Sequence, residues 1–228
     1  YNSGKYDIII VDCAPTADTL RLLSFPEILR WWMEKMFPIG RTATSMLRPF
    51  VQPLIGIPLP DKEVFDSAED LFNELQRIRA LLTKPDRASI RLVLNPEKMV
   101  IKEAQRIFTY LNLYGYSTDL IICNRLIPER VEDSYFHSWK KNQSKYYQVI
   151  KECFAPLPIL TAPLLEQEVV GLPMLKLMAD NIYGEDDPTK VFFLGQAQEI
   201  QKKDSYYVLT IPLPFTNKEQ VSLMQSGD

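Results

Sequence analysis

The sequence is short of basic charge, of cysteine and of long apolar runs, and each shortage excludes a class of protein. Its 228 residues hold 26 Lys and Arg against 29 Asp and Glu, which argues against a nucleic-acid-binding surface. No apolar run reaches the roughly 18 residues that a membrane-spanning helix needs. Three cysteines without a Cys-x-x-Cys pair favour reduced thiols over disulfides. We therefore expect a cytoplasmic globular protein that binds no nucleic acid.

Short apolar segments alternate with helical patterns along the middle of the chain. Residues 89–94, 119–123 and 158–161 have the length and branching of buried strands. Residues 64–82 and 99–113 repeat apolar side chains at helical spacing. This alternation predicts βαβ units, and hence an α/β fold with a mainly parallel sheet and flanking helices.

The most informative segment lies near the start, where the apolar run of residues 8–11 ends at Asp12. A β-branched run of this length predicts a further buried parallel strand over residues 7–12. Ligands of α/β sheets bind beyond the carboxyl ends of the strands. A carboxylate at that position can hold Mg²⁺ beside a nucleotide phosphate, directly or through water.

Residues 12–21 read Asp-Cys-Ala-Pro-Thr-Ala-Asp-Thr-Leu-Arg. This run resembles the second switch of the ArsA-type ATPases, D-T-A-P-T-G-H-T-L-R, a family that includes arsenite-pump and tail-anchored-protein targeting ATPases. The family's Gly and His are Ala17 and Asp18 here, departures that bear on switching and hydrolysis more than on nucleotide binding.

The resemblance implies a P-loop NTPase-like fold that binds ATP and Mg²⁺. Asp12 would then serve the metal or the attacking water, with Thr16 and Asp18 as the other catalytic candidates. Pro15 and Thr19 would contact the nucleotide. Catalysis would depend mostly on positioning and charge stabilisation.

Two later segments carry the same resemblance. Residues 119–129 resemble the family's V-N-x-L-x-P-E run, whose Asn reads adenine, and this assigns base reading to Asn124; an amide offers one donor and one acceptor to a base edge. Residues 162–172 resemble the loop M-P-L-x-x-x-E-[IV]-x-G-L, which places Pro163 and Leu164 on the other side of the base. The alternatives are an Asn in an Asx turn and plain packing of the two loop residues.

The glycine-rich loop that cradles nucleotide phosphates, G-x-x-x-x-G-K-[ST], does not occur in these residues. The run Ser3-Gly4-Lys5 matches only its end. We therefore expect the sequence to be the C-terminal part of a longer ATPase, and to be inactive by itself.

No structural zinc is expected. The targeting members carry a zinc-binding Cys-x-x-Cys upstream of a tryptophan; with Trp139 as the anchor, those positions are Glu132 and Tyr135, and Tyr cannot supply a thiolate. The single histidine, His137, is expected to be a surface or packing residue.

Residues 26–59 are rich in methionine and aromatic side chains, a composition suited to a groove for varied apolar ligands. In the targeting relatives this position builds a groove for a transmembrane segment. A buried helical subdomain or a dimer interface is the alternative. The candidate client surface comprises Trp31, Trp32, Met33, Met36, Phe37, Met46 and Phe50.

The predicted organisation is an ATPase domain over 1–184 with a helical insertion at 26–84, a linker at 185–204 and a β-rich tail at 205–228. The tail resembles the start of the α-crystallin-like β-module appended to some, notably cyanobacterial, ArsA-type ATPases; a docked C-terminal hairpin is the alternative. The function so implied is a homodimeric ATPase that couples Mg-ATP hydrolysis to transport or targeting of a client, such as an apolar transmembrane segment or a membrane pump. The alternative is a chaperone-like protein that binds apolar segments and uses nucleotide as a structural ligand or not at all.

Overall fold

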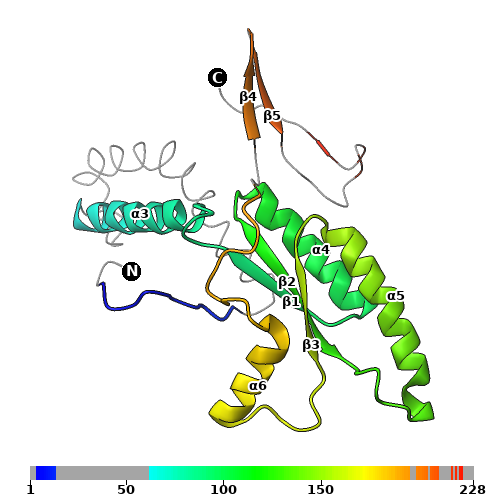
Figure 1. The fold of residues 1–228 in the computed structure, drawn as a ribbon. Helices are drawn as coiled ribbons and strands as arrows, with labels where there is room; N and C mark the ends of the chain where they lie inside the picture. The colour runs from blue at the N-terminus through cyan, green and yellow to red at the C-terminus, as the bar shows by residue number, and fades with distance from the viewer. Residues whose placement is uncertain are drawn as a thin grey trace, which may run out of the picture. The chain divides into compact units, whose positions relative to one another are not determined.

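A computed structural model describes residues 4–13, 62–195, 199–204, 206–210, 217, 219, 221 and 222 (Figure 1). The chain divides into two compact units, one of Tyr1–Ile9 with Lys84–Asp228 and one of Ile10–Thr83. In the second unit the structure describes helix α3 (Lys62–Leu82), which confirms the helix predicted at 64–82.

The larger unit contains a parallel sheet of strands β1 (Ile90–Leu94), β2 (Thr118–Leu126) and β3 (Ile159–Pro163). Their order in the sheet is β1-β2-β3, so β2 lies between the other two. All three strands predicted for this region are present, and the α/β fold with a parallel sheet is confirmed. Side chains of β2 such as Leu120, Ile121 and Cys123 are completely buried, as expected of a strand with neighbours on both edges and helices on both faces.

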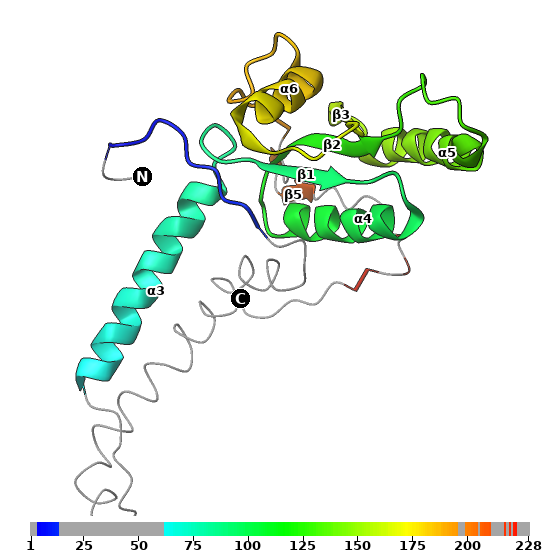
Figure 2. The same cartoon turned by 90° about the horizontal axis from the view of Figure 1, so that it is seen from below.

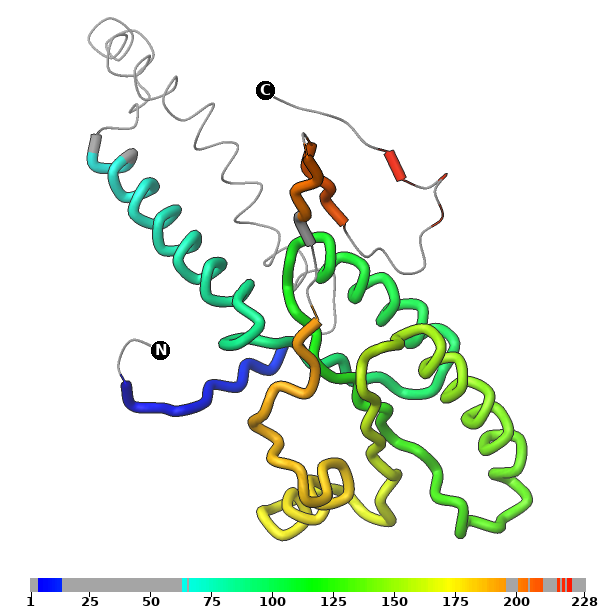
Figure 3. Tube along the Cα trace, turned by 45° about the horizontal axis from the view of Figure 1, so that its top comes forward, coloured from blue at the N-terminus to red at the C-terminus, as the bar shows by residue number. Residues whose placement is uncertain are grey.

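In the part of the chain that the structure describes, helices α4 (Lys98–Leu113), α5 (His137–Phe154) and α6 (Gly171–Tyr183) flank this sheet. Helices α4 and α5 lie side by side (Figure 3), whereas α6 packs on β3 from the opposite face to α4 (Figure 2). A short 3₁₀ helix, η2 (Ser134–Phe136), precedes α5. On the α6 face, Leu120, Ile122 and Ala162 form a core cluster. No helix in the part of the chain that the structure describes is long and apolar enough to cross a membrane.

The segment after α6 is fastened to the beginning of the sheet by a buried charge. Asp119 is fully buried; its carboxylate accepts hydrogen bonds from the Arg91 guanidinium, at 3.4 Å, and from the backbone N–H of Phe192, at 3.1 Å. The same guanidinium donates to the carbonyl oxygens of Pro188, at 2.7 Å, and Lys190, at 2.8 Å. Residues 188–192 are therefore attached to the sheet, although they lie in the range that the sequence predicted to be linker.

The strand predicted at residues 7–12 is not formed. Residues 4–13 have no regular secondary structure, and Ile8, Ile9, Ile10 and Val11 are between 51% and 89% exposed. An apolar run becomes a strand only beside another strand that pairs its backbone groups. None of the three strands of the described parallel sheet pairs with these residues.

The described end of the chain contains an antiparallel hairpin of β4 (Glu199–Lys203) and β5 (Tyr206–Thr210). Strand β5 lies in the tail predicted to be β-rich from residue 205 onward, whereas the whole of β4 lies within the predicted linker, 185–204. The domain limits themselves, and the assignment of the tail to an α-crystallin-like module, stay predictions.

Candidate functional site

The candidate site lies where β2 and β3 end, because their carboxyl ends are neighbours in the sheet. Cys123 pairs with Thr161 and Leu126 with Pro163, so β2 carries one extra residue in this interval and forms a bulge. The backbone N–H of Leu164 donates to the carbonyl of Leu126 at 2.7 Å. Asn124 and Pro163, two residues that the sequence assigned to the nucleotide base, thus stand at the ends of adjacent strands.

Asn124 is held by a local hydrogen bond. Its Oδ1 accepts from the backbone N–H of the next residue, Arg125, at 2.9 Å, whereas an Asx turn would pair this oxygen with the N–H two residues on. Arg125 adopts a left-handed conformation with φ of 57°, an arrangement uncommon outside glycine and often found at functional sites. With Oδ1 turned toward the backbone, the amide presents Nδ2 as a donor, and Oδ1 keeps one lone pair for a second partner.

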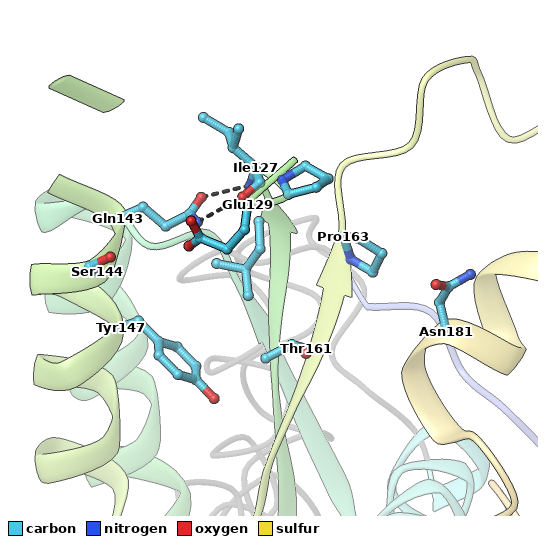
Figure 4. Close-up of a pocket in the computed structure, with 10 residues that line it drawn as sticks. Ile127, Glu129, Gln143, Ser144, Tyr147, Thr161, Pro163 and Asn181 are labelled. Carbon is cyan, nitrogen blue, oxygen red and sulfur yellow. Dashed lines mark hydrogen bonds between the residues drawn. The ribbon is translucent and has the colours of Figure 1, made fainter. Parts of the chain in front are cut away.

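A cavity of about 460 Å³ opens beside these strand ends (Figure 4). Its walls come from the end of β2 and the following loop, from β3, from one side of α5 and from Asn181 of α6. Pro163 lines it, whereas Asn124 and Leu164 are not among the lining residues. The lining residues are Leu126, Ile127, Pro128, Glu129, Gln143, Ser144, Tyr147, Thr161, Pro163 and Asn181.

The loop after β2 is attached to α5 by side chains of that helix. Gln143 pairs with both backbone groups of Ile127: its Oε1 accepts from the N–H at 2.7 Å, and its Nε2 donates to the carbonyl at 3.2 Å (Figure 4). Lys140 donates through Nζ to the carbonyl oxygens of Glu129, at 2.7 Å, and Val131, at 3.3 Å, and pairs with the Glu129 carboxylate at 3.2 Å.

A further ion pair joins the two loops that follow β2 and β3. Arg130 and Glu166 approach to 2.8 Å, and both side chains are largely exposed. Exposed pairs contribute little to stability, so this contact serves mainly to bias the relative position of the loops.

Two titratable groups near these strand ends have a pKa that burial shifts. Burial raises the pKa of the Cys123 thiol to about 11. It also raises the pKa of Tyr147, with the nearby Cys123 as a second cause. Near neutral pH the Tyr147 hydroxyl therefore keeps its proton and can donate a hydrogen bond into the cavity.

The remaining residues predicted for the site lie in the exposed segment 4–13 or outside the described residues. Asp12 lies in the irregular, exposed segment 4–13. Pro15, Thr16, Asp18 and Thr19 fall outside the described residues, as does the whole candidate client surface. Within the described ranges, no group of three His, Cys, Asp or Glu side chains could hold a metal ion.

The sequence analysis did not predict that residues of α5 line the cavity. Gln143, Ser144 and Tyr147 share one face of a helix at spacings of three and four residues, and this spacing was the available signal. Helical spacing shows which side chains of α5 lie on one face, but it does not show which strand end that face contacts.

Comparison with known proteins shows which family the chain matches. The family model described as anion-transporting ATPase matches residues 1–184. A putative arsenical pump-driving ATPase of Aquifex aeolicus is 39% identical over 232 residues, which cover 100% of this chain and 59% of that protein. A protein of the same description from Prosthecochloris vibrioformis is 35% identical, with 100% of this chain and 57% of that protein covered. The ATPase GET3 of Mycosarcoma maydis is 32% identical over 184 residues, 76% of this chain and 53% of the relative. The chain thus spans somewhat more than half the length of these relatives.

Proposed function

Since this chain belongs to the anion-transporting ATPase family, we propose that it supplies the base-binding side and the second switch of a Mg²⁺-dependent ATPase. The relatives described above are named ATPases. The reaction proposed for the whole protein is hydrolysis of the ATP γ-phosphate, with bound Mg²⁺ neutralising charge on the phosphates.

The observation that carries this proposal is the meeting of Asn124 and Pro163 at the carboxyl ends of two adjacent parallel strands, next to a cavity of about 460 Å³. This is the edge of an α/β sheet at which ligands bind. The cavity has apolar walls at Leu126, Ile127 and Pro163, and it also has several hydroxyl and amide groups. Apolar walls with a few convergent polar groups suit a flat heteroaromatic base.

Each residue has a separate role in this proposal. Asn124 reads the base edge, with Nδ2 as the donor, because its contact to Arg125 uses only Oδ1. Pro163 and Leu164 cover the opposite side of the base. Asp12 is the residue proposed to hold Mg²⁺ or the attacking water, and Thr16 and Asp18 complete the switch.

The output proposed for the whole protein is mechanical. A change of nucleotide state at residues 12–21 would move the adjoining residues 26–59, and this movement would carry an apolar protein segment or drive a membrane partner in a homodimer. The names of the relatives, arsenical pump-driving ATPase and ATPase GET3, support a role of this general kind. The chaperone-like reading predicts binding of an apolar segment without turnover.

The test uses the full-length protein, assayed for ATP turnover with and without Mg²⁺. We expect Mg²⁺-dependent turnover that Asp12→Asn abolishes. Asn124→Asp should raise the KM for ATP about tenfold or more, because a carboxylate lacks the amide donor and losing one such hydrogen bond costs about 1–3 kcal/mol.

Asn142→Asp makes the same chemical change at an exposed position of α5 and serves as the control. Its KM should stay at the wild-type value. Turnover that is absent in the wild type would favour the chaperone-like reading, and an unchanged KM in Asn124→Asp would refute the base site.

A further inference from the structure

Helix α5 holds the loop after β2 in an unusual way. The side-chain amide of Gln143 offers one donor and one acceptor, which is the same pair that a peptide group offers. It engages both backbone groups of Ile127, at 2.7 and 3.2 Å, as a neighbouring strand would. The pairing begins one residue after β2 ends at Leu126, so Gln143 extends the hydrogen bonding of the strand by side-chain means.

Lys140 adds to this attachment from one turn earlier on the same helix. Its ammonium group reaches the carbonyl oxygens of Glu129 and Val131. Four hydrogen bonds from two side chains thus hold residues 127–131, and Gln143 and Lys140 are themselves half-buried. Partial exclusion of water strengthens such bonds relative to exposed ones.

The position of this loop determines the shape of the cavity. Leu126, Ile127, Pro128 and Glu129 line the cavity together with Pro163, the cross-strand partner of Leu126. Asn124 lies three residues before Ile127, on the other side of the bulge in β2. If the backbone at Ile127 shifts, this wall of the cavity shifts with it.

We infer that Gln143 is a positioning residue for base recognition: it fixes the backbone of Ile127 and thereby aligns the wall of the cavity with the nucleotide base. This inference rests on the proposed function. Gln143 does not itself need to touch the nucleotide, and Lys140 is its auxiliary.

The experiment separates base recognition from phosphate binding in the full-length protein. A fluorescent ATP analogue is displaced by ATP and, in parallel, by inorganic tripolyphosphate, which carries the phosphates without the base. In Gln143→Leu the Kd for ATP should rise about tenfold while the Kd for tripolyphosphate stays at the wild-type value. Gln143→Glu keeps the acceptor for the Ile127 N–H but loses the donor, so its Kd for ATP should be intermediate.

Gln148→Leu is the matched control, because Gln148 is exposed on the same helix and its amide bonds Glu152 at 3.1 Å. Both Kd values should be unchanged in this variant. If Gln143→Leu fails to fold, as judged by its circular dichroism and Tm, then Gln143→Glu and Lys140→Met decide the question.

Two results would overturn the inference, and they differ. If a folded Gln143→Leu keeps the wild-type ratio of the two Kd values, Gln143 has only a structural role and the proposed function stands. If the wild-type protein itself binds ATP no more tightly than tripolyphosphate, the base site is refuted and the proposed function fails with it.

Discussion

In the unit that contains the parallel sheet, several polar side chains form hydrogen bonds with backbone groups of other residues. Asn124 fixes the N–H of Arg125, Gln143 pairs with Ile127, and Asp119 receives the N–H of Phe192. A buried or half-buried polar group must find such a partner, since leaving it unpaired costs about 1–3 kcal/mol. Gln143 and Asp119 therefore each connect two segments that are distant in the sequence. Asn124 instead fixes the turn of the chain at the residue that follows it.

Burial of Cys123 leads to a prediction about pH. Its thiol pKa is raised from 9.0 to about 11, so between these pH values the unfolded state binds fewer protons than the folded state. The free energy of unfolding should therefore fall as the pH rises from about 9 to about 11. One fully linked proton sets an upper limit of about 1.4 kcal/mol per pH unit for this slope.

The measurement is urea unfolding of the wild type and of Cys123→Ala across that pH range. The variant should lose less stability per pH unit, although a smaller decline from Tyr147, whose pKa is raised in the same direction, should persist. Parallel curves for the two proteins would contradict the prediction.

At the scale of elements, the two sheets differ in how they are supported. Strand β2 has a neighbour on each side and a buried surface. Among the described residues, the hairpin of β4 and β5 has no third strand, and the side chains of Tyr206, Tyr207 and Leu209 are more than half exposed. An isolated two-stranded hairpin is marginally stable in water.

Amide hydrogen exchange should distinguish these two elements. We expect the amides of Leu120–Cys123 in β2 to exchange only with global unfolding, and the cross-strand amides of β4 and β5 to exchange faster by about a hundredfold or more, because local opening of a weakly supported hairpin costs little. Protection of the hairpin equal to that of β2 would show that another surface covers it.

At the scale of the whole molecule, the sheet unit extends past the end of the family match at residue 184. The Arg91 guanidinium and the Asp119 carboxylate bind the backbone of Pro188, Lys190 and Phe192. Removing partners from a buried charged group is costly, since the charge remains and its hydrogen bonds are lost.

Two shortened forms of the protein test this extension. A chain that ends after Gly184 should lose about 2 kcal/mol or more in its free energy of unfolding relative to a chain that ends after Gly195, because only the longer form keeps the backbone groups of residues 188–192 that bind Arg91 and Asp119. Urea unfolding measures the difference. Equal stabilities would mean that residues 188–192 contribute nothing to the sheet unit.

Several features could be predicted from the sequence because they depend on local pattern. Strands β1, β2 and β3 and helices α3 and α4 follow from apolar runs and helical spacing. Gly115, which follows the end of α4, has φ of 78°, which glycine adopts without strain. The positions of Asn124 and Pro163 near strand ends follow from the same local sequence pattern.

The sequence by itself determined the family, the alternation of strands and helices, and the polar residues that follow the strands, because these depend on the order and spacing of neighbouring side chains. Only the tertiary structure decided that α5 brings Gln143 and Tyr147 to the cavity and that Asp119 fastens residues 188–192, because pairing between distant segments depends on how the chain packs. It likewise decided that residues 8–11, apolar as they are, form no strand in the described sheet. A strand requires the hydrogen bonds of a neighbour as well as a suitable sequence.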